Sequence, residues 1–319
     1  MMYRLTPVVK NLIVINLIVY VLNIFTTPAQ EFGVLFGLRA YNSPEFQPYQ
    51  ILTYMFIHAK INPMSNNIDF MHIFGNMFAL FMFGTWLETL FGSRKFLAFY
   101  MLTGMGAGIL NSGFNYYFIE RQKADVEKFL DYEKPGSLEF VQYLGKHAPK
   151  SQELNLDYID AVQEVEEGVE GLTDSIQKYK KEIAQLDSTQ DQEKLNQLVN
   201  YLELQRDTLK YKEEVYRKDM VNFVKNSYTY SLNARTVGAS GAIFGILVAF
   251  AMIFPNLTLM LIIPPIPIQA KYLAMFYVLF ELYSGLEYGG ASQVAHFAHL
   301  SGALVGFLLI RYWGIKRQL

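Results

Sequence analysis

The chain has 319 residues, of which 52% are hydrophobic and 15% aromatic, and its formal net charge is −2 at pH 7. This small net charge hides an uneven distribution, because the block from Glu120 to Lys225 holds 16 basic and 23 acidic residues and leaves 11 and 6 for the rest. Neither part has the strongly basic balance of a nucleic-acid-binding protein. Cysteine is absent, which excludes disulfides, thiolate nucleophiles and cysteine metal sites.

Long apolar windows outside the charged block predict transmembrane helices, and the charged block predicts a water-soluble insertion. The expected fold class is an all-α membrane protein, a six-helix transmembrane bundle with an inserted extramembrane helical hairpin. Residues 1–118 are expected to hold helices one to three, 119–228 the insertion, and 229–319 helices four to six. The six windows lie near Val8–Phe25, Phe70–Trp86, Phe96–Tyr117, Gly241–Phe254, Tyr272–Leu286 and Val294–Trp313.

The lysines and arginines of the short loops predict the orientation in the membrane. Both termini are expected in the cytoplasm and the insertion outside it, in a bacterial plasma membrane. The first apolar run also fits a cleaved signal peptide, although the spans that follow favour an uncleaved helix. One side of the membrane would hold Arg4, Lys10, Arg94, Lys95, Lys271, Arg311, Lys316 and Arg317, and the other Arg39, Lys60 and Arg235.

Apolar residues three and four apart run through the insertion and predict two antiparallel helices of a coiled-coil hairpin. Such a hairpin is interpreted either as a spacer or dimerising arm, or as a docking or gating device above the site. The first series is Ile159, Val162, Val165, Val169, Leu172, Ile176, Tyr179, Ile183 and Leu186. The second is Leu195, Leu198, Leu202, Leu209, Tyr216, Met220 and Phe223.

A serine lies between glycines where the fourth apolar window begins, in the stretch Val237–Gly245. Gly241 and Gly245 share one helical face, which a neighbouring helix can approach closely. Ser240 is therefore either a small packing residue or a nucleophile. The window is shorter than the roughly 20 residues that span a bilayer, so Ser240 is expected below the membrane surface.

His299, Gly302 and Gly306 lie at i, i+3 and i+7 in the last window and so share a face. If this face packs on the glycine face of the fourth window, Ser240 and His299 come within reach of a base and nucleophile contact. An ionisable residue at membrane depth marks a functional site by default. The alternatives are a histidine bonded to a backbone carbonyl, and His296 as the base, although the register with the glycines favours His299.

His72 and Asn76 lie four residues apart on one face of the second window. Both side chains can donate hydrogen bonds to a developing oxyanion, and one such donor lowers a barrier by roughly 3 kcal/mol. The structural alternative is a polar contact between helices. A zinc site formed by His58, His72, His296 and His299 is disfavoured, because no HExxH sequence or aspartate partner accompanies them.

Three motifs, in this order along the chain, resemble those of the rhomboid intramembrane proteases. His72 and Asn76 are similar to the HxxxN of their second helix, and Gly238-Ala239-Ser240-Gly241 is similar to their GxSG. Ala298-His299, with Gly302 and Gly306, is similar to the AHxxGxxxG of their sixth helix. The similarity covers roughly residues 8–118 and 229–312, including Glu88–Gly92, and leaves out the insertion.

The resemblance implies a serine endopeptidase in the lipid bilayer that cleaves transmembrane segments of membrane proteins. It implies a Ser240–His299 dyad with an acyl-enzyme intermediate, and an oxyanion hole made by His72, Asn76 and the Ser240 backbone amide. It implies no cofactor and no metal. A homo-oligomer or a docking partner through the insertion is expected as a further partner.

The family has no aspartate behind its histidine, so another group must hold the ring. Phe244 lies where many relatives carry a tyrosine that stacks on the histidine, and Gly238, Gly241 and Gly302 are expected to support the site. Tyr49-Gln50 replaces a Trp-Arg pair often seen in the first loop. The alternative function is a non-catalytic rhomboid-like binder of membrane clients, a class that typically loses the serine or the histidine, whereas both are present here.

Overall fold

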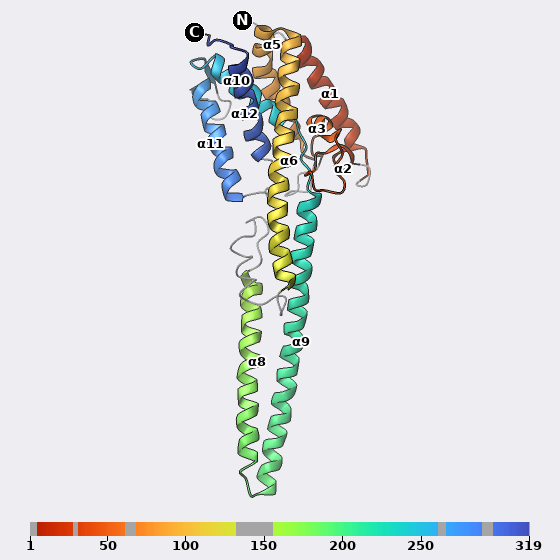
Figure 1. The fold of residues 1–319 in the computed structure, drawn as a ribbon, viewed down its shortest axis with the longest axis vertical. Helices are drawn as coiled ribbons and strands as arrows, with labels where there is room; N and C mark the ends of the chain where they lie inside the picture. The colour runs from red at the N-terminus through yellow and green to blue at the C-terminus, as the bar shows by residue number, and fades with distance from the viewer. Residues whose placement is uncertain are drawn as a thin grey trace. The chain divides into compact units, whose positions relative to one another are not determined.

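The computed structural model describes residues 5–27, 31–60, 68–131, 156–260, 266–288 and 296–318. Within these residues the fold is all-α except for one two-stranded sheet (Figure 1). Contacts divide the chain into two compact units, of which the first is Met1–Glu120 with Tyr230–Leu319 and the second is Arg121–Thr229. The insertion expected over 119–228 overlaps the second unit.

The helices of the first unit lie on the apolar windows of the sequence, although α6 continues past the end of its window at Tyr117 to Asp131. These helices are α1 (Pro7–Ile24), α4 (Phe70–Ala79), the π-helical turn η3 (Leu80–Gly84), α5 (Thr85–Phe91), α6 (Ser93–Asp131), α10 (Ser240–Ile253), α11 (Ala270–Tyr288) and α12 (His296–Tyr312). By length and composition, two segments of the described chain are able to cross a membrane, Pro7–Ile24 and Phe70–Phe91. The count of six crossings stays a prediction.

The loop between α1 and α4 carries short helices rather than an open linker. They are α2 (Phe32–Phe36), α3 (Gln50–Thr53) and the 3-10 turn η2 (Tyr54–Phe56). Past α10, β1 (Thr258–Met260) pairs antiparallel with β2 (Pro267–Gln269), a sheet that the sequence reading did not predict. α10 ends at Ile253 and α11 starts at Ala270, and Pro264 and Pro265 between them lie outside the described residues.

The first unit buries several polar side chains beside its apolar core and exposes many large apolar ones, unlike a typical water-soluble domain. Its buried polar residues include Asn16, Asn23, Thr103, Asn111, Ser112, Glu281, Ser284 and Ser301. Its exposed apolar residues include Val14, Ile18, Val21 and Leu22 on α1, and Met275, Phe276, Leu279 and Phe280 on α11. Side chains of this kind on the outer surface are suited to lipid, and polar groups inside are satisfied between helices.

The buried carboxylate of Glu88 fixes the start of α1. It accepts the backbone N–H of Val8 at 2.9 Å and that of Val9 at 2.9 Å, and the Ser93 hydroxyl donates to it at 2.7 Å. The first N–H groups of a helix have no partner within the helix and carry its positive dipole end, so an acidic side chain stabilises them. Pro7 at the first helical position has no N–H to satisfy.

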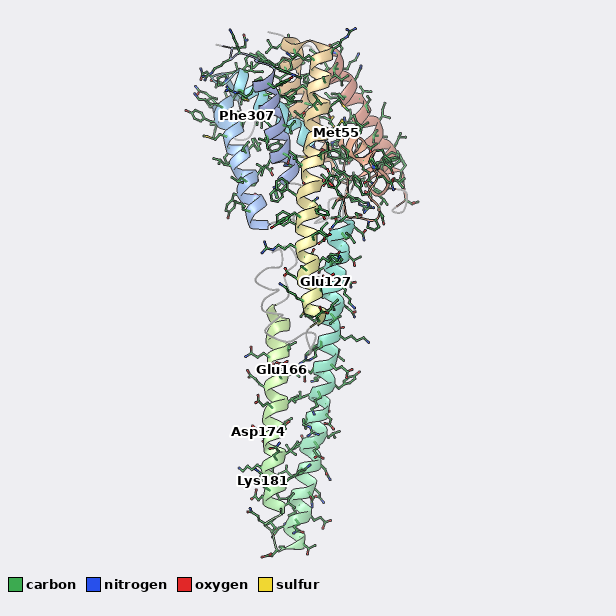
Figure 2. All side chains as sticks on the ribbon, in the orientation of Figure 1. Met55, Glu127, Glu166, Asp174, Lys181 and Phe307 are labelled. Atoms are coloured by element: carbon green, nitrogen blue, oxygen red, sulfur yellow. The ribbon has the colours of Figure 1, made fainter. Side chains whose placement is uncertain are left out.

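In the second unit, α8 (Leu156–Ile183) packs antiparallel on α9 (Thr189–Asn233). Arg217 pairs with Glu166 at 2.9 Å and Lys180 with Glu203 at 2.7 Å, so the residue numbers of paired positions rise on one helix as they fall on the other. Figure 2 shows Glu166, Asp174 and Lys181 along α8.

The sequence reading placed two residues of α9 wrongly in the seam. Leu198 and Phe223 are 39% and 37% exposed, whereas the neighbouring Val199 and Val224 are buried. The seam of a helix pair continues by alternating steps of three and four from Val199, and this register passes through polar positions such as Glu213. A prediction from apolar character alone therefore chose Leu198 instead of Val199 and Phe223 instead of Val224 for the seam.

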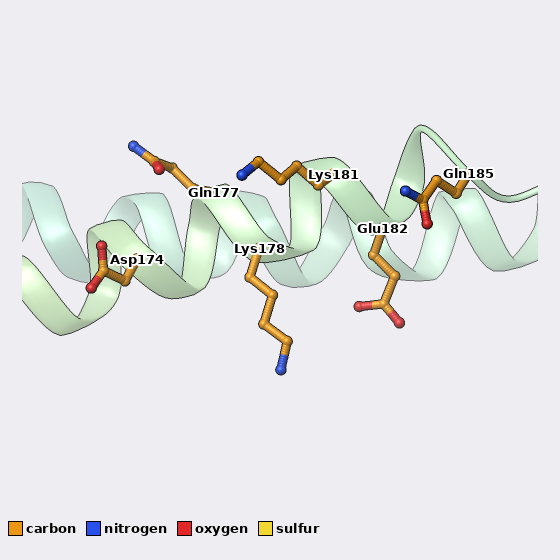
Figure 3. A pocket seen from close by; sticks show the side chains of 6 residues that line it. All are labelled: Asp174, Gln177, Lys178, Lys181, Glu182 and Gln185. Carbon is orange, nitrogen blue, oxygen red and sulfur yellow. The ribbon is translucent and has the colours of Figure 1, made fainter.

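A shallow depression lies at the C-terminal end of α8, next to the turn that leads to α9. Figure 3 shows that polar side chains of α8 and of the turn after it surround the depression. They carry both signs of charge and form no apolar wall, which a small-molecule site requires. The lining residues are Asp174, Gln177, Lys178, Lys181, Glu182 and Gln185.

Candidate active site

Ser240 is the first residue of α10, and the backbone before it takes a shape that only glycine readily adopts. Gly238 has φ +117°, and its N–H donates to the Tyr54 carbonyl at 2.9 Å. A Cβ on Gly238 would lie 2.9 Å from His72 Nε2 and 3.7 Å from Ser240 Oγ. A side chain at this position would therefore fill the space that His72 and Ser240 share.

The first loop holds the segment that leads into Ser240. Leu38 and Thr236 exchange two backbone hydrogen bonds of 2.9 and 2.8 Å, and Asn111 on α6 donates to the Thr236 hydroxyl at 2.9 Å. The Tyr54 hydroxyl donates to the Gly104 carbonyl of α6 at 2.7 Å. The first loop and α6 thus both hold the segment that leads into Ser240. These contacts were not predicted from the sequence.

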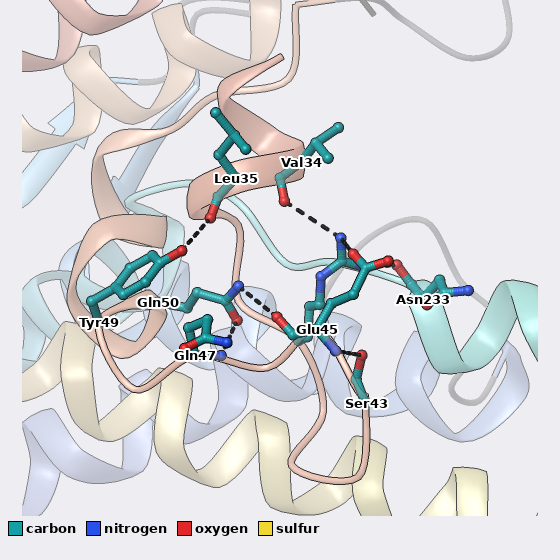
Figure 4. Close-up of polar contacts among 9 residues, drawn as sticks. Val34, Leu35, Ser43, Glu45, Gln47, Tyr49, Gln50 and Asn233 are labelled. Atoms are coloured by element: carbon teal, nitrogen blue, oxygen red, sulfur yellow. Dashed lines mark hydrogen bonds and ion pairs between the residues drawn. The ribbon is translucent and has the colours of Figure 1, made fainter. Parts of the chain in front are cut away.

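Figure 4 shows polar contacts of the first loop, among them those of Glu45, Tyr49 and Gln50. Arg39 of the same loop is buried. Its guanidinium donates to the Asn233 carbonyl at 2.7 Å and pairs with the Glu45 carboxylate. Gln50, also buried, donates to the Glu45 carbonyl at 3.1 Å, and the Tyr49 hydroxyl donates to the Leu35 carbonyl at 3.1 Å. Tyr49 and Gln50 thus hold the loop together through contacts within it.

Helices α10 and α12 touch along their glycines. A Cβ on Gly302 would lie 1.9 Å from the Gly241 carbonyl oxygen, and one on Gly306 would lie 2.7 Å from the Gly245 Cα. No other residue type leaves room for such backbone contact. The contact sets α12 against the first turn of α10, the turn that carries Ser240.

His299, on the first turn of α12, lies between an aromatic face and a carboxylate. Its ring is parallel to that of Phe244, with centroids 4.4 Å apart and an interplanar angle of 4°. Its Nδ1 lies 2.9 Å from Glu281 Oε1 on α11. This contact departs from the direction of an Nδ1–H bond, so it is a close electrostatic contact rather than a hydrogen bond.

Glu281 also contacts the second histidine of α12. Its other oxygen, Oε2, lies 2.6 Å from His296 Nδ1, and both side chains are buried. The sequence reading expected no acidic partner for the histidine and overlooked Glu281. The available signal was its position, because it is the one charged residue in the apolar window Tyr272–Leu286.

His72 and Asn76 share a face of α4, at the end where Asp69 caps the helix. The Asp69 carboxylate accepts the His72 backbone N–H at 3.1 Å. The Asn76 amide donates to the His72 carbonyl at 2.9 Å, which leaves one N–H for another acceptor. His58 lies against His72 with ring centroids 5.2 Å apart, and burial, with a contribution from His72, lowers the pKa of His58 to about 3.

The geometry thus gathers the three motifs around one point without completing every contact between them. Gly238 lies beside both Ser240 and His72, and α12 brings His299 onto Phe244, one turn after Ser240 on α10. Within the described residues, no hydrogen bond joins Ser240 to His299, as is common in unliganded catalytic sites. Among the same residues no group of three histidine or acidic side chains is arranged to hold a metal ion.

Comparison with protein families gives one match, the Rhomboid domain, over residues 45–120 and 220–315. Comparisons with curated proteins and with solved structures give no match. The matched residues make up more than half of the chain and include the serine, the histidines and the glycine faces described above. This chain therefore belongs to the rhomboid family and is an integral membrane protein.

Proposed function

We propose that this protein is an intramembrane serine protease that cleaves transmembrane segments of other membrane proteins. The family consists typically of such proteases. The observation that carries the proposal is the contact of α10 and α12 through Gly241 and Gly302, because it brings the His299 ring against the first turn of α10. That turn begins at Ser240, and His72 lies next to it across Gly238.

In the proposed reaction, Ser240 Oγ attacks the carbonyl carbon of the scissile peptide bond while its proton passes to His299 Nε2. The tetrahedral oxyanion accepts hydrogen bonds from His72, Asn76 and the Ser240 N–H. The last of these is at the start of α10, where backbone N–H groups have no partner within the helix. His299 gives the proton to the leaving amine, and water then hydrolyses the ester on Ser240.

Phe244 and the glycines support this reaction without taking part in it. The parallel stack with Phe244 limits rotation of the His299 ring. Gly238 leaves space for His72 and Ser240, and Gly241 and Gly302 allow the helices to touch. The roles of the three glycines depend on the absence of a side chain, so larger residues at these positions would block the site.

The six-span topology, with both termini in the cytoplasm and the insertion outside, is part of the proposal. The insertion is proposed as an arm that meets a client, a docking partner or a second copy of the chain. Its surface supports this, because α9 exposes large apolar side chains at heptad spacing. They are Tyr201, Leu204, Tyr211 and Val215.

Labelling of Ser240 by a fluorophosphonate probe tests the proposal. Purified protein in detergent should be labelled and should cleave a transmembrane reporter, and Ser240→Ala should abolish both. Chelator should change neither activity. A folded wild-type protein that is never labelled and does not cleave would instead be a non-catalytic binder of membrane clients.

A further inference from the structure

The Glu281 carboxylate is the feature of the bundle that the Ser240–His299 reaction leaves unused. It is buried on α11, and among the side chains of the described residues its oxygens contact two histidines of α12 and no lysine or arginine. A buried carboxylate costs several kcal/mol unless hydrogen bonds or opposite charges compensate it. An apolar residue at this position would pack α11 on α12 without that cost.

We propose that Glu281 positions His299 for the reaction, so that the site works as a serine, histidine and glutamate arrangement. This inference rests on the proposed function. Glu281 Oε1 faces His299 Nδ1 at 2.9 Å, and Phe244 covers one face of the same ring. The carboxylate favours the tautomer with hydrogen on Nδ1, which leaves the lone pair of Nε2 free to accept the Ser240 proton.

Glu281 also stabilises the imidazolium that forms when His299 takes the proton from Ser240. A negative charge at this distance in a site of low dielectric favours the positive ring, and Glu281 itself takes up no proton. The proton stays on His299 Nε2 until the leaving amine takes it. Glu281 touches neither the substrate nor the reacting atoms, so it is a positioning residue.

His296 holds Glu281 in place. Its Nδ1 contacts Oε2 at 2.6 Å, so the two oxygens of the carboxylate are each directed at one histidine. A carboxylate held at both oxygens cannot turn away from His299. This arrangement gives the two histidines different tasks, with His299 as the base and His296 as the anchor of Glu281.

Substitution Glu281→Gln tests the positioning role, because the amide keeps the shape but one of its two atoms can no longer accept a hydrogen bond. We expect the labelling rate of Ser240 to fall about a hundredfold, less than the roughly 10⁴-fold cost in a linear triad, because this contact is bent. Glu281→Asp should restore part of the rate. Ser284→Ala, at another buried polar residue of α11, is the matched control and should label as wild type does.

Thermal unfolding separates positioning from a merely structural role. Glu281→Gln should slow labelling while its unfolding temperature stays close to that of Ser284→Ala. A labelling rate that falls only together with a large drop in unfolding temperature would mean that Glu281 only holds α11 against α12. His296→Ala should lower the thermal unfolding temperature. It should lower the labelling rate by less than the hundredfold expected for Glu281→Gln.

One further measurement needs no variant of Glu281 and covers the case in which such variants do not fold. In wild-type protein labelled with ¹⁵N-histidine, the His299 signal, assigned by its loss in His299→Gln, should show hydrogen on Nδ1. The opposite tautomer overturns the inference, as does wild-type labelling in a folded Glu281→Gln variant. Either result leaves the protease proposal standing, whereas wild-type protein that does not label overturns both.

Discussion

Replacing Gly302 by alanine tests whether close contact of α10 and α12 sets the geometry of the site. The new Cβ would lie 1.9 Å from the Gly241 carbonyl oxygen, whereas Cβ atoms essentially never come within 3.0 Å of another heavy atom. The obstacle is backbone and cannot rotate away, so the helices have to separate by about 1 Å. Overpacking of this kind costs about 1–3 kcal/mol of folding free energy.

The separation should reach the proposed catalytic pair, because Ser240 is on one helix and His299 is on the other. A misplacement of 1 Å costs about a hundredfold in rate. We therefore expect Gly302→Ala to lower the labelling rate of Ser240 by about that factor and to lower the unfolding temperature. Gly306→Ala should have a smaller effect on labelling, since its Cβ would lie 2.7 Å from Gly245 and farther along the helix from Ser240.

Gly75→Ala is the matched control, because a Cβ there would meet no atom within 4 Å. It replaces a helical glycine in the same unit and should stabilise α4 by roughly 0.5–1 kcal/mol without changing the labelling rate. Labelling kinetics and thermal unfolding in detergent measure both quantities. Wild-type labelling and stability in Gly302→Ala would show that the helices do not touch as described.

Two further predictions concern the first loop and the insertion. Because burial lowers the pKa of folded His58 to about 3 while an unfolded histidine titrates near 6.5, the unfolded state binds the extra proton between these values. Stability should therefore fall by up to about 1.4 kcal/mol per pH unit as the pH drops below 6.5, and His58→Gln should remove this slope in unfolding curves. Replacing Ala124–Val221 by a short Gly/Ser bridge should leave Ser240 labelling intact and lower cleavage of a full-length client if the insertion docks substrates. Unchanged client cleavage would leave it a structural role, and lost labelling would show that it helps to hold the site together.

Local patterns in the sequence predicted those parts of the site that repeat at helical spacing. The glycine faces at Gly241 and Gly302 need only the helical period, and the start of α10 at Ser240 follows from its flanking glycines. The stack of Phe244 on His299 was expected from the family resemblance rather than from periodicity. In the insertion, periodicity indicated two helices, but in α9 it misplaced Leu198 and Phe223.

Contacts between residues far apart in the chain were not predictable in this way. Glu281 meets His299 only because α11 packs on α12 in one register, and a single acidic residue in an apolar window does not reveal its partner. The pairing of Leu38 with Thr236 joins two loops almost two hundred positions apart. Leu198 and Val199 are equally apolar, so only the packing of α9 decides which of them is buried.

In the proposed protease, the short length of α10 would bring Ser240 within reach of water. The C-terminal end of α10 is bonded to the C-terminal segment of the chain, because the Gln318 backbone N–H donates to the Ile253 carbonyl at 2.7 Å. The bundle end there is basic, and Lys95 lies over the Trp313 ring at 4.8 Å, a pair suited to the membrane interface.

In the proposed six-span topology, with that end at one membrane boundary, 14 residues rise roughly 21 Å against a hydrocarbon core of about 30 Å, which would place Ser240 roughly 9 Å below the opposite boundary. The chain just before Ser240 is held by polar contacts, because Arg39 donates to the Asn233 carbonyl and Asn111 to the Thr236 hydroxyl. In the proposed protease, the water that hydrolyses the ester on Ser240 would have to cross only this shorter distance.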